Sequence, residues 1–223
     1  MMPFHRLGAF SAKRHLLSTT IACLVIGGQL ASAAQVFNNR TNFLNATGPL
    51  FSEGFEGLPA NNNTNLVSVV TNDFTVTSSN NELGIFNIPL AGSAATEGAN
   101  ALVHQSGANV TTTFTFDFPI DSFGFDLLDY GDFGTGQLRL TNNAGDNVVV
   151  AVAGAADGNV QYFGVISDFL FTQAVLTNTI AGEAFGFDRM SYGTGVPEPS
   201  VLVLLAIGYA GIAGCTRRRR TAA

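Results

Sequence analysis

The clearest pattern in the chain is an alternation of apolar and polar residues near its middle. Phe114, Phe116 and Phe118 occupy every second position, and threonine and aspartate residues stand between them. Successive side chains of a strand point to opposite faces, so this period of two predicts a half-buried β-strand. Pro119 is expected to end that strand, because proline has no backbone donor for a sheet ladder, and residues 120–128 are expected to begin the next.

Short runs rich in valine, threonine and phenylalanine continue along the chain. They are separated by clusters of Asn, Gly, Asp and Pro, which are common turn residues. No stretch of residues 34–195 shows a sustained helical period. The further predicted strands are 66–77, 82–88, 137–141, 147–152, 160–166, 169–171, 174–179 and 184–192, with 142–146 as a hairpin turn and 34–59 as a lead-in. Roughly ten short strands predict an all-β fold, an antiparallel β-sandwich of jelly-roll-like form.

The C-terminal residues 196–223 follow a different pattern. An uncharged apolar run, residues 201–215, predicts a single transmembrane helix that is short against the usual span of roughly 17–25 residues. Prolines before the run keep the chain extended, and arginines after it resist translocation and are expected to stay in the cytoplasm. The flanking residues are Pro197, Glu198 and Pro199 on one side and Arg217, Arg218, Arg219 and Arg220 on the other.

The order of Pro-Glu-Pro, short apolar helix and arginine cluster resembles the PEP-CTERM sorting signal of Gram-negative bacteria. In that family an inner-membrane exosortase recognises the tail and cuts the chain near Pro-Glu-Pro. The mature protein then passes to the cell surface or to the extracellular polysaccharide matrix. The resemblance implies an exported precursor that is anchored in the inner membrane and cleaved near Pro197. An ordinary C-terminal anchor that is never processed is the alternative.

The N-terminal residues 1–33 carry the features of a signal peptide. Basic residues precede an apolar segment, Leu16 to Gly28, and Ala31, Ser32 and Ala33 then supply the small side chains that a signal peptidase recognises. Cleavage is therefore expected before Ala34, which leaves residues 34–195 as the ectodomain. A second membrane helix is the alternative.

Removing both ends changes the charge balance. Residues 34–195 contain three arginines, no lysine and fifteen acidic residues, a net charge of −12. A surface of this charge repels nucleic acid and favours cations, so no nucleic-acid partner is expected. Cys23 and Cys215 both lie in the segments expected to be removed, which excludes disulfide and thiol chemistry from the ectodomain.

One nine-residue stretch, 123–131, recurs at 185–193 with six identical positions. Similar burial of two strands explains this repeat, with phenylalanine inward and glycine permitting close packing. A sharper interpretation places Asp126 and Asp188 at one end of the sandwich, where they share a cation or a sugar. The second copy also resembles the closing strand of PEP-CTERM ectodomains, which are described as lectin-like or carbohydrate-binding-module-like sandwiches.

Few residues of the ectodomain suggest a metal or a catalytic group. Asp126, Asp129 and Asp132, with Gly131 and Gly134, form a carboxylate run that offers oxygen ligands to calcium. The run lacks the strict spacing of a known calcium loop, so solvated turn carboxylates are the preferred interpretation. No other metal or cofactor is predicted. His104 is the single histidine of the ectodomain, which excludes a multi-histidine zinc site. A Ser-His-Asp triad would need His104, and no Gly-x-Ser-x-Gly elbow accompanies it.

Three functions follow from these residues. The preferred one is a non-enzymatic surface or matrix protein with a structural or interaction role, processed by signal peptidase and exosortase. The second is a carbohydrate-binding module that contacts extracellular polysaccharide, which in the absence of tryptophan would use tyrosine rings. The third is a hydrolase with Glu53 and Glu56 as paired carboxylates. The tyrosines are Tyr130, Tyr162 and Tyr192.

Overall fold

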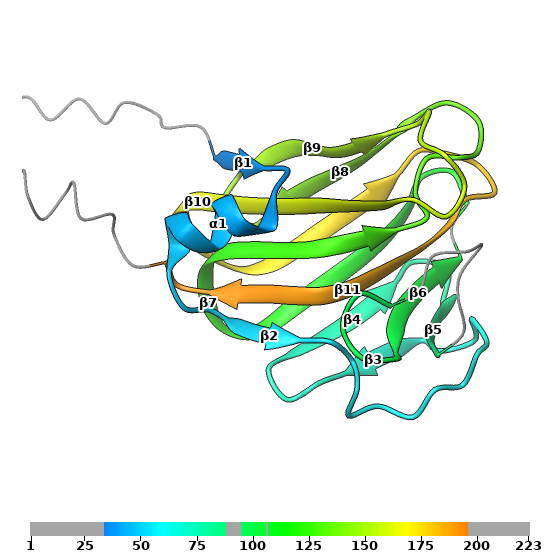
Figure 1. Cartoon of the computed structure of the whole chain (residues 1–223), viewed down its shortest axis with the longest axis horizontal. Helices are drawn as coiled ribbons and strands as arrows, with labels where there is room; N and C mark the ends of the chain where they lie inside the picture. The colour runs from blue at the N-terminus through cyan, green and yellow to red at the C-terminus, as the bar shows by residue number, and fades with distance from the viewer. Residues whose placement is uncertain (1–33, 88–94, 106, 196–223) are drawn as a thin grey trace, which may run out of the picture. The chain divides into compact units, whose positions relative to one another are not determined.

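A computed structural model describes residues 34–87, 95–105 and 107–195 (Figure 1). Within these ranges the chain forms strands throughout, with one short helix, as the all-β prediction requires. The elements are β1 Gln35–Phe37, α1 Arg40–Thr47, β2 Phe51–Glu53, β3 Ser68–Val70, β4 Phe74–Ser78, β5 Leu83–Phe86, β6 Ala101–Gln105, β7 Val110–Leu128, β8 Gln137–Asn142, β9 Asn147–Val152, β10 Val160–Asn178 and β11 Ala184–Gly193. The expected signal peptide, sorting motif, apolar helix and arginine cluster lie outside the described residues.

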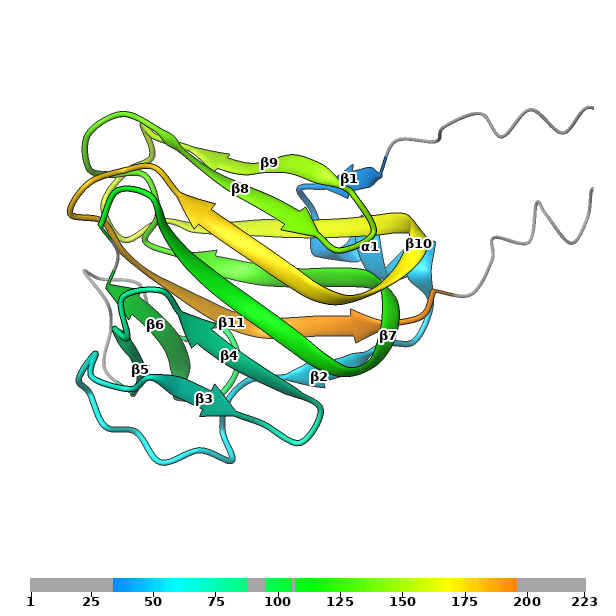
Figure 2. The same ribbon diagram turned by 180° about the vertical axis from the view of Figure 1, so that it is seen from behind.

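The strands pair into one antiparallel sheet that folds over itself into two layers (Figures 1 and 2). The first layer has the order β3-β4-β7-β10-β8-β9 and uses residues 110–116 of β7 and 173–178 of β10. The second layer has the order β5-β6-β11-β7-β10-β1, with β2 also on β11, and uses residues 122–128 of β7 and 160–166 of β10. The predicted antiparallel sandwich is therefore confirmed.

The two longest strands carry the chain from one layer to the other. β7 and β10 each contain 19 residues, and the register between them shifts where both bend, around Ile120 and Phe171. Pro119 lies at this bend and has no ladder partner, so its missing N–H costs no hydrogen bond there. The expectation that Pro119 ends a strand is therefore wrong, and so is the division of 160–179 into three strands.

Aromatic side chains from both layers fill the core. The ring centroid of Phe114, from the first layer, lies 5.4 Å from that of Phe187 in the second, in a T-shaped arrangement. Phe74 and Tyr192 face each other across the layers in the same way, with centroids 5.3 Å apart. Phe114 and Phe116 are buried, as their alternation with polar residues predicted. Edge-to-face pairs of this kind add about 0.5–1.5 kcal/mol each beyond the area they bury.

Helix α1 was not predicted. Its signals are local, since Asn39 caps the first turn by accepting a hydrogen bond from the Asn42 amide and Gly48 ends the helix with a φ of 74°. Only Phe43 and Thr47 are buried, and two buried side chains in eight residues form no apolar stripe. The lead-in thus contains β1, α1 and β2. The helix found in the described ranges is too short and too polar to cross a membrane.

The other boundaries follow the turn residues. The predicted strand 66–77 is two strands, β3 and β4, joined by a turn in which the Thr71 amide donates to the Phe74 carbonyl over 3.0 Å. Strand β6 follows a segment rich in small residues and was not predicted. The hairpin between β8 and β9 has its turn at 142–146, as expected, with Gly145 at a φ of 103°.

Candidate functional site

The two copies of the repeat lie side by side, because Asp126 of β7 is the register partner of Asp188 of β11. Protein groups already bind both carboxylates. Asp188 accepts hydrogen bonds from the amides of Thr96 and Glu97 through Oδ2, and Asp126 lies 3.7 Å from the Arg189 guanidinium. The expectation that this pair shares a cation or a sugar is therefore wrong. Burial raises the pKa of Asp188, and the backbone amides that it binds act against this rise.

The glycines of the repeat serve packing. Gly124 and its register partner Gly164 lie under the ring of Phe43, which holds α1 on the outer face of the second layer. A Cβ atom on Gly164 would lie 2.7 Å from the Phe43 ring, and one on Gly124 would lie 2.4 Å from the Tyr162 hydroxyl. The interpretation of the repeat as two similarly buried strands is confirmed, since phenylalanines point into the core on both.

The three tyrosines do not form a sugar-binding row. Tyr130 and Tyr192 belong to the core, at 0% and 1% exposure. Tyr162 is half-buried, its hydroxyl is enclosed, and the guanidinium carbon of Arg40 lies 5.9 Å from its ring centroid. None of these rings is available as an exposed stacking surface, so the tyrosine platform is a wrong prediction.

His104 is a structural residue. Its ring is fully buried, with Nδ1 2.6 Å from the Thr112 hydroxyl and Nε2 2.9 Å from Oδ1 of Asn80. Burial lowers the pKa of His104 to about 4, so the ring stays neutral at physiological pH. Neither ring nitrogen contacts a carboxylate, and the geometry of a Ser-His-Asp triad is absent around this residue.

The glutamates considered for hydrolysis bind backbone instead. Glu53 accepts a hydrogen bond from the Phe55 amide, and Glu56 accepts hydrogen bonds from the amides of Ala99 and Asn100. Both therefore fix loops. A glycosidase needs two carboxylates that converge on one substrate, whereas these two bind backbone amides of different segments.

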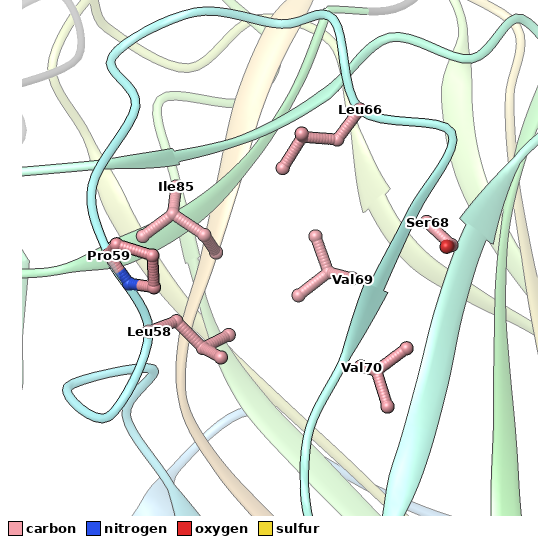
Figure 3. A pocket seen from close by; sticks show the side chains of 7 residues that line it. All are labelled: Leu58, Pro59, Leu66, Ser68, Val69, Val70 and Ile85. Atoms are coloured by element: carbon pink, nitrogen blue, oxygen red, sulfur yellow. The ribbon is translucent and has the colours of Figure 1, made fainter.

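An apolar hollow of about 170 Å³ opens between β3, β5 and the segment before β3 (Figure 3). Figure 3 shows Leu58, Pro59 and Ile85 on one side of it and Val69 on the other. Leu66, Ser68 and Val70 complete the lining, which contains no ionisable group. The hollow offers apolar contact but no general acid or base.

The carboxylates that do converge lie at one end of the sandwich. Oxygen atoms of Asp129, Asp132 and Asp157 come within 4.8 Å of one another. Asp129 is buried, Asp132 is half-buried and Asp157 is exposed, so the cluster extends from the interior to solvent. Glu183 adjoins it, because its carboxyl group interacts with that of Asp132. We call these four residues the acid cluster.

Three loops hold the acid cluster, at the right-hand end of the molecule in Figure 1. They are the loops β7–β8, β9–β10 and β10–β11, and hydrogen bonds tie them together. The Gly158 amide donates to Oδ1 of Asp129 over 2.7 Å, and the Gly131 amide donates to Oε1 of Glu183 over 3.2 Å. The Gly131 carbonyl accepts from the amide of Gly154 over 2.7 Å. The carboxylates are therefore pre-positioned.

The electrostatics of the acid cluster are unfavourable as it stands. Burial raises the pKa of Asp129, and repulsion from Asp132 and Asp157 adds to the rise. Burial, together with the charge of Asp132, raises the pKa of Glu183 to about 7. The arginines of the described ranges are occupied elsewhere: Arg40 binds Ser191, Arg139 binds Asn147 and Arg189 pairs with Asp126.

Sequence reasoning identified half of the acid cluster. Asp129 and Asp132 were grouped in the predicted run and do lie together, whereas Asp126 lies outside the cluster and pairs with Arg189. Asp157 and Glu183 were missed. Each adjoins a glycine with positive φ, Gly158 at 71° and Gly182 at 77°, so each was recognisable as a turn residue. That signal reveals a turn but not which other turns surround it.

No family model matches the sequence, and no curated protein matches it. Among solved structures, the chain resembles a variant of a family 29 carbohydrate-binding module in complex with mannohexaose, at 13% identity and a TM-score of 0.37 over 66% of this chain and 94% of that one. The module TmCBM61 in complex with β-1,4-galactotriose matches at 12% identity and a TM-score of 0.34, over 62% of this chain and 92% of that one. The K2 cleaved adhesin domain of Lys-gingipain matches at 13% identity and a TM-score of 0.38, over 65% of this chain and 99% of that one. These matches concern the path of the backbone and not the residues of any binding site.

Proposed function

We propose that this protein is an exported, non-enzymatic surface or matrix protein whose β-sandwich is released from an inner-membrane precursor by an exosortase. Signal peptidase would cut before Ala34, and the exosortase would cut near Pro197. The released domain then takes a structural or interaction role among extracellular polysaccharides.

The observation that carries this proposal is the position of the sandwich between the two expected cuts. β1 begins at Gln35, one residue after the first cut, and β11 ends at Gly193. The Gly195 amide donates to Oδ1 of Asp121 over 2.7 Å, so the domain is closed just before Val196. Cleavage at both points would leave every described strand and the whole described core intact.

The positions of the described ends also support release. Strand β1 and the end of β11 lie at one end of the sandwich, and the loops β7–β8, β9–β10 and β10–β11 that hold the acid cluster lie at the other (Figures 1 and 2). A domain tethered through residue 195 would therefore direct its acid cluster away from the tether. The acidic surface, with a net charge of −12 over residues 34–195, favours solubility after release.

The test compares variants of the tail in cells that contain an exosortase. Changing Pro197, Glu198 and Pro199 together to alanine should leave the apolar helix inserted but prevent cutting, so uncut protein accumulates in the inner membrane. Replacing the four arginines with neutral residues should instead weaken membrane retention of the uncut chain. Each arginine opposes passage of the C-terminus through the membrane, by roughly 2.5–3.5 kcal/mol at mid-membrane. Fractionation with a tag in the domain separates the two outcomes.

The intact mass of the released protein locates both cuts, and a mass that begins at Ala34 and ends near Pro197 is expected. Normal release of the triple-alanine variant would show that Pro-Glu-Pro is only a linker and would contradict the exosortase proposal.

Polysaccharide binding at the acid cluster is the second candidate. Phe133 is 57% exposed and directly follows Asp132, whose carboxyl group lies close to that of the exposed Asp157. An exposed aromatic ring offers an apolar face to a sugar ring, and neighbouring carboxylates accept hydrogen bonds from hydroxyl groups. Phe133 thus takes the place of the tyrosines that the sequence had suggested.

A further inference from the structure

We infer that the acid cluster is a calcium site, in which Asp129, Asp132, Asp157 and Glu183 hold one Ca²⁺ that locks three loops at the end of the sandwich. The ligand set differs from the one that the sequence suggested, because Asp126 is excluded and two residues from distant loops are included. The inference is independent of export and of cleavage by an exosortase.

Glu183 has a buried carboxylate oxygen that no donor satisfies. This side chain is fully buried, and its Oε2 atom has no hydrogen-bond partner. The other oxygen, Oε1, accepts from the Gly131 amide, and the Asp132 carboxyl group and the Phe133 amide also approach the Glu183 carboxyl group. A buried carboxylate oxygen without a donor costs roughly 1–3 kcal/mol or more, so native proteins rarely retain one without a reason. A cation bound to Oε2 would supply the missing partner.

The oxygens of the three aspartates are placed as ligands of one ion would be. Asp129 uses Oδ1 to accept the Gly158 amide, which leaves its second oxygen for a ligand role. The three aspartates can each place one oxygen within 4.8 Å of the others. Two oxygens on opposite sides of one Ca²⁺ stand about 4.6–5.2 Å apart, since each lies about 2.3–2.6 Å from the ion. The aspartate oxygens are therefore close enough to share a single ion.

The charge of the acid cluster also favours a cation. Four carboxyl groups meet here, and no arginine of the described ranges makes an ion pair with any of them. Their mutual repulsion opposes folding unless protons or a cation neutralise them. An all-oxygen set without histidine or cysteine suits a hard cation, and calcium takes six to eight such ligands. Asp157 is exposed, so water can complete the coordination on the open side.

The predicted consequence is order in the loops β7–β8, β9–β10 and β10–β11. Each of them supplies at least one ligand, so an ion shared among them would add to the hydrogen bonds that already join these segments. Because the unfolded chain cannot bring these residues together, the ion should bind the folded state and raise its stability by mass action.

Calorimetric titration of CaCl₂ into the full-length chain, purified in non-ionic detergent and treated with chelator, tests the site. One Ca²⁺ per chain is expected, with a rise in the thermal midpoint. Asp132→Asn and Glu183→Gln should each weaken binding by at least about tenfold. Asp157→Asn should do the same, and its exposed side chain makes this variant the least able to disturb folding, which circular dichroism would check.

The matched control is Asp117→Asn, which removes one exposed carboxylate of β7 beside the turn between β3 and β4. It should bind calcium as the parent chain does. The inference is overturned if the parent chain shows neither heat nor a midpoint shift at millimolar Ca²⁺, or if the cluster variants bind as tightly as the parent. It is also overturned if Asp117→Asn loses as much as they do, or if Mg²⁺ gives the same rise, since either result indicates general charge screening.

Discussion

The buried neutral His104 makes the stability of this domain depend on pH in a calculable way. The ordinary pKa of histidine is 6.5, and burial lowers that of His104 to about 4. As the pH falls from 6.5 to 4, the unfolded chain binds a proton at this residue and the folded chain does not. Acidification over this window therefore stabilises the unfolded state and lowers the free energy of unfolding. This decrease levels off below the folded pKa.

The size of the effect follows from the shift. One pKa unit corresponds to about 1.4 kcal/mol, so His104 should remove about 3 kcal/mol of unfolding free energy between neutral pH and pH 4. The hydrogen bonds around the ring define the folded tautomer. Nδ2 of Asn80 donates to Glu82 and to the Gln105 carbonyl, which turns Oδ1 of Asn80 toward Nε2 of His104. Nε2 therefore carries the proton, and Nδ1 accepts from Thr112.

The assay compares the parent domain with His104→Gln by urea unfolding at several pH values from 7.5 to 4. Glu183 has a raised pKa and acts with the opposite sign over much of this range, so the parent curve alone does not isolate His104. Both proteins contain Glu183, and the difference between their curves removes its contribution. The gap between the two free energies should change by about 3 kcal/mol across the window. Parallel curves would refute the assignment of a neutral, desolvated histidine.

Two further predictions concern packing and ligand binding. Gly164→Ala should lower the unfolding free energy by about 1–3 kcal/mol, because its new methyl group would meet the Phe43 ring at 2.7 Å. Gly57→Ala, where nothing lies within 4 Å, should stay within about 0.5 kcal/mol of the parent, and equal losses in urea unfolding would contradict the packing of α1 on the sheet. If the domain binds polysaccharide at the acid cluster, a glycan array should give signals that Phe133→Ala abolishes, whereas Phe169→Ala, which removes a ring with 63% exposure, should keep them. Signals that survive Phe133→Ala would place any glycan site elsewhere.

The bend of the long strands illustrates how far local patterns reach. The alternation around Phe114 and Phe116 located the strand and its buried face correctly. The pattern also contained Pro119, which forbids a ladder hydrogen bond but does not forbid an extended chain. Whether a ladder partner stands opposite Pro119 depends on β10, and β10 shifts register at this point. The local rule therefore predicted the end of a strand at a position where the strand continues through a bend.

The tyrosines failed as a prediction for a related reason. Tyr130 lies just beyond the end of β7, and its hydroxyl donates to Oδ1 of Asn178, a residue 48 positions away, over 3.0 Å. A buried tyrosine needs such a partner, and nothing in its own neighbourhood along the chain identifies one. Composition alone suggested that these rings would replace tryptophan at a surface, whereas the core of the sandwich required them.

The sequence by itself determined the features that are local or compositional. These are the positions of most strands, the turn at 142–146, the charge of −12 and the signals expected to direct export and sorting, since each depends on residues close together in the chain. Only the tertiary structure decided the membership of the acid cluster. Glu183 reaches Gly131 across 52 residues, and Gly158 reaches Asp129 across 29. Such contacts exist because β7 and β10 pair along both layers and bring their loops to the same end, and a period of two cannot specify which loop ends meet.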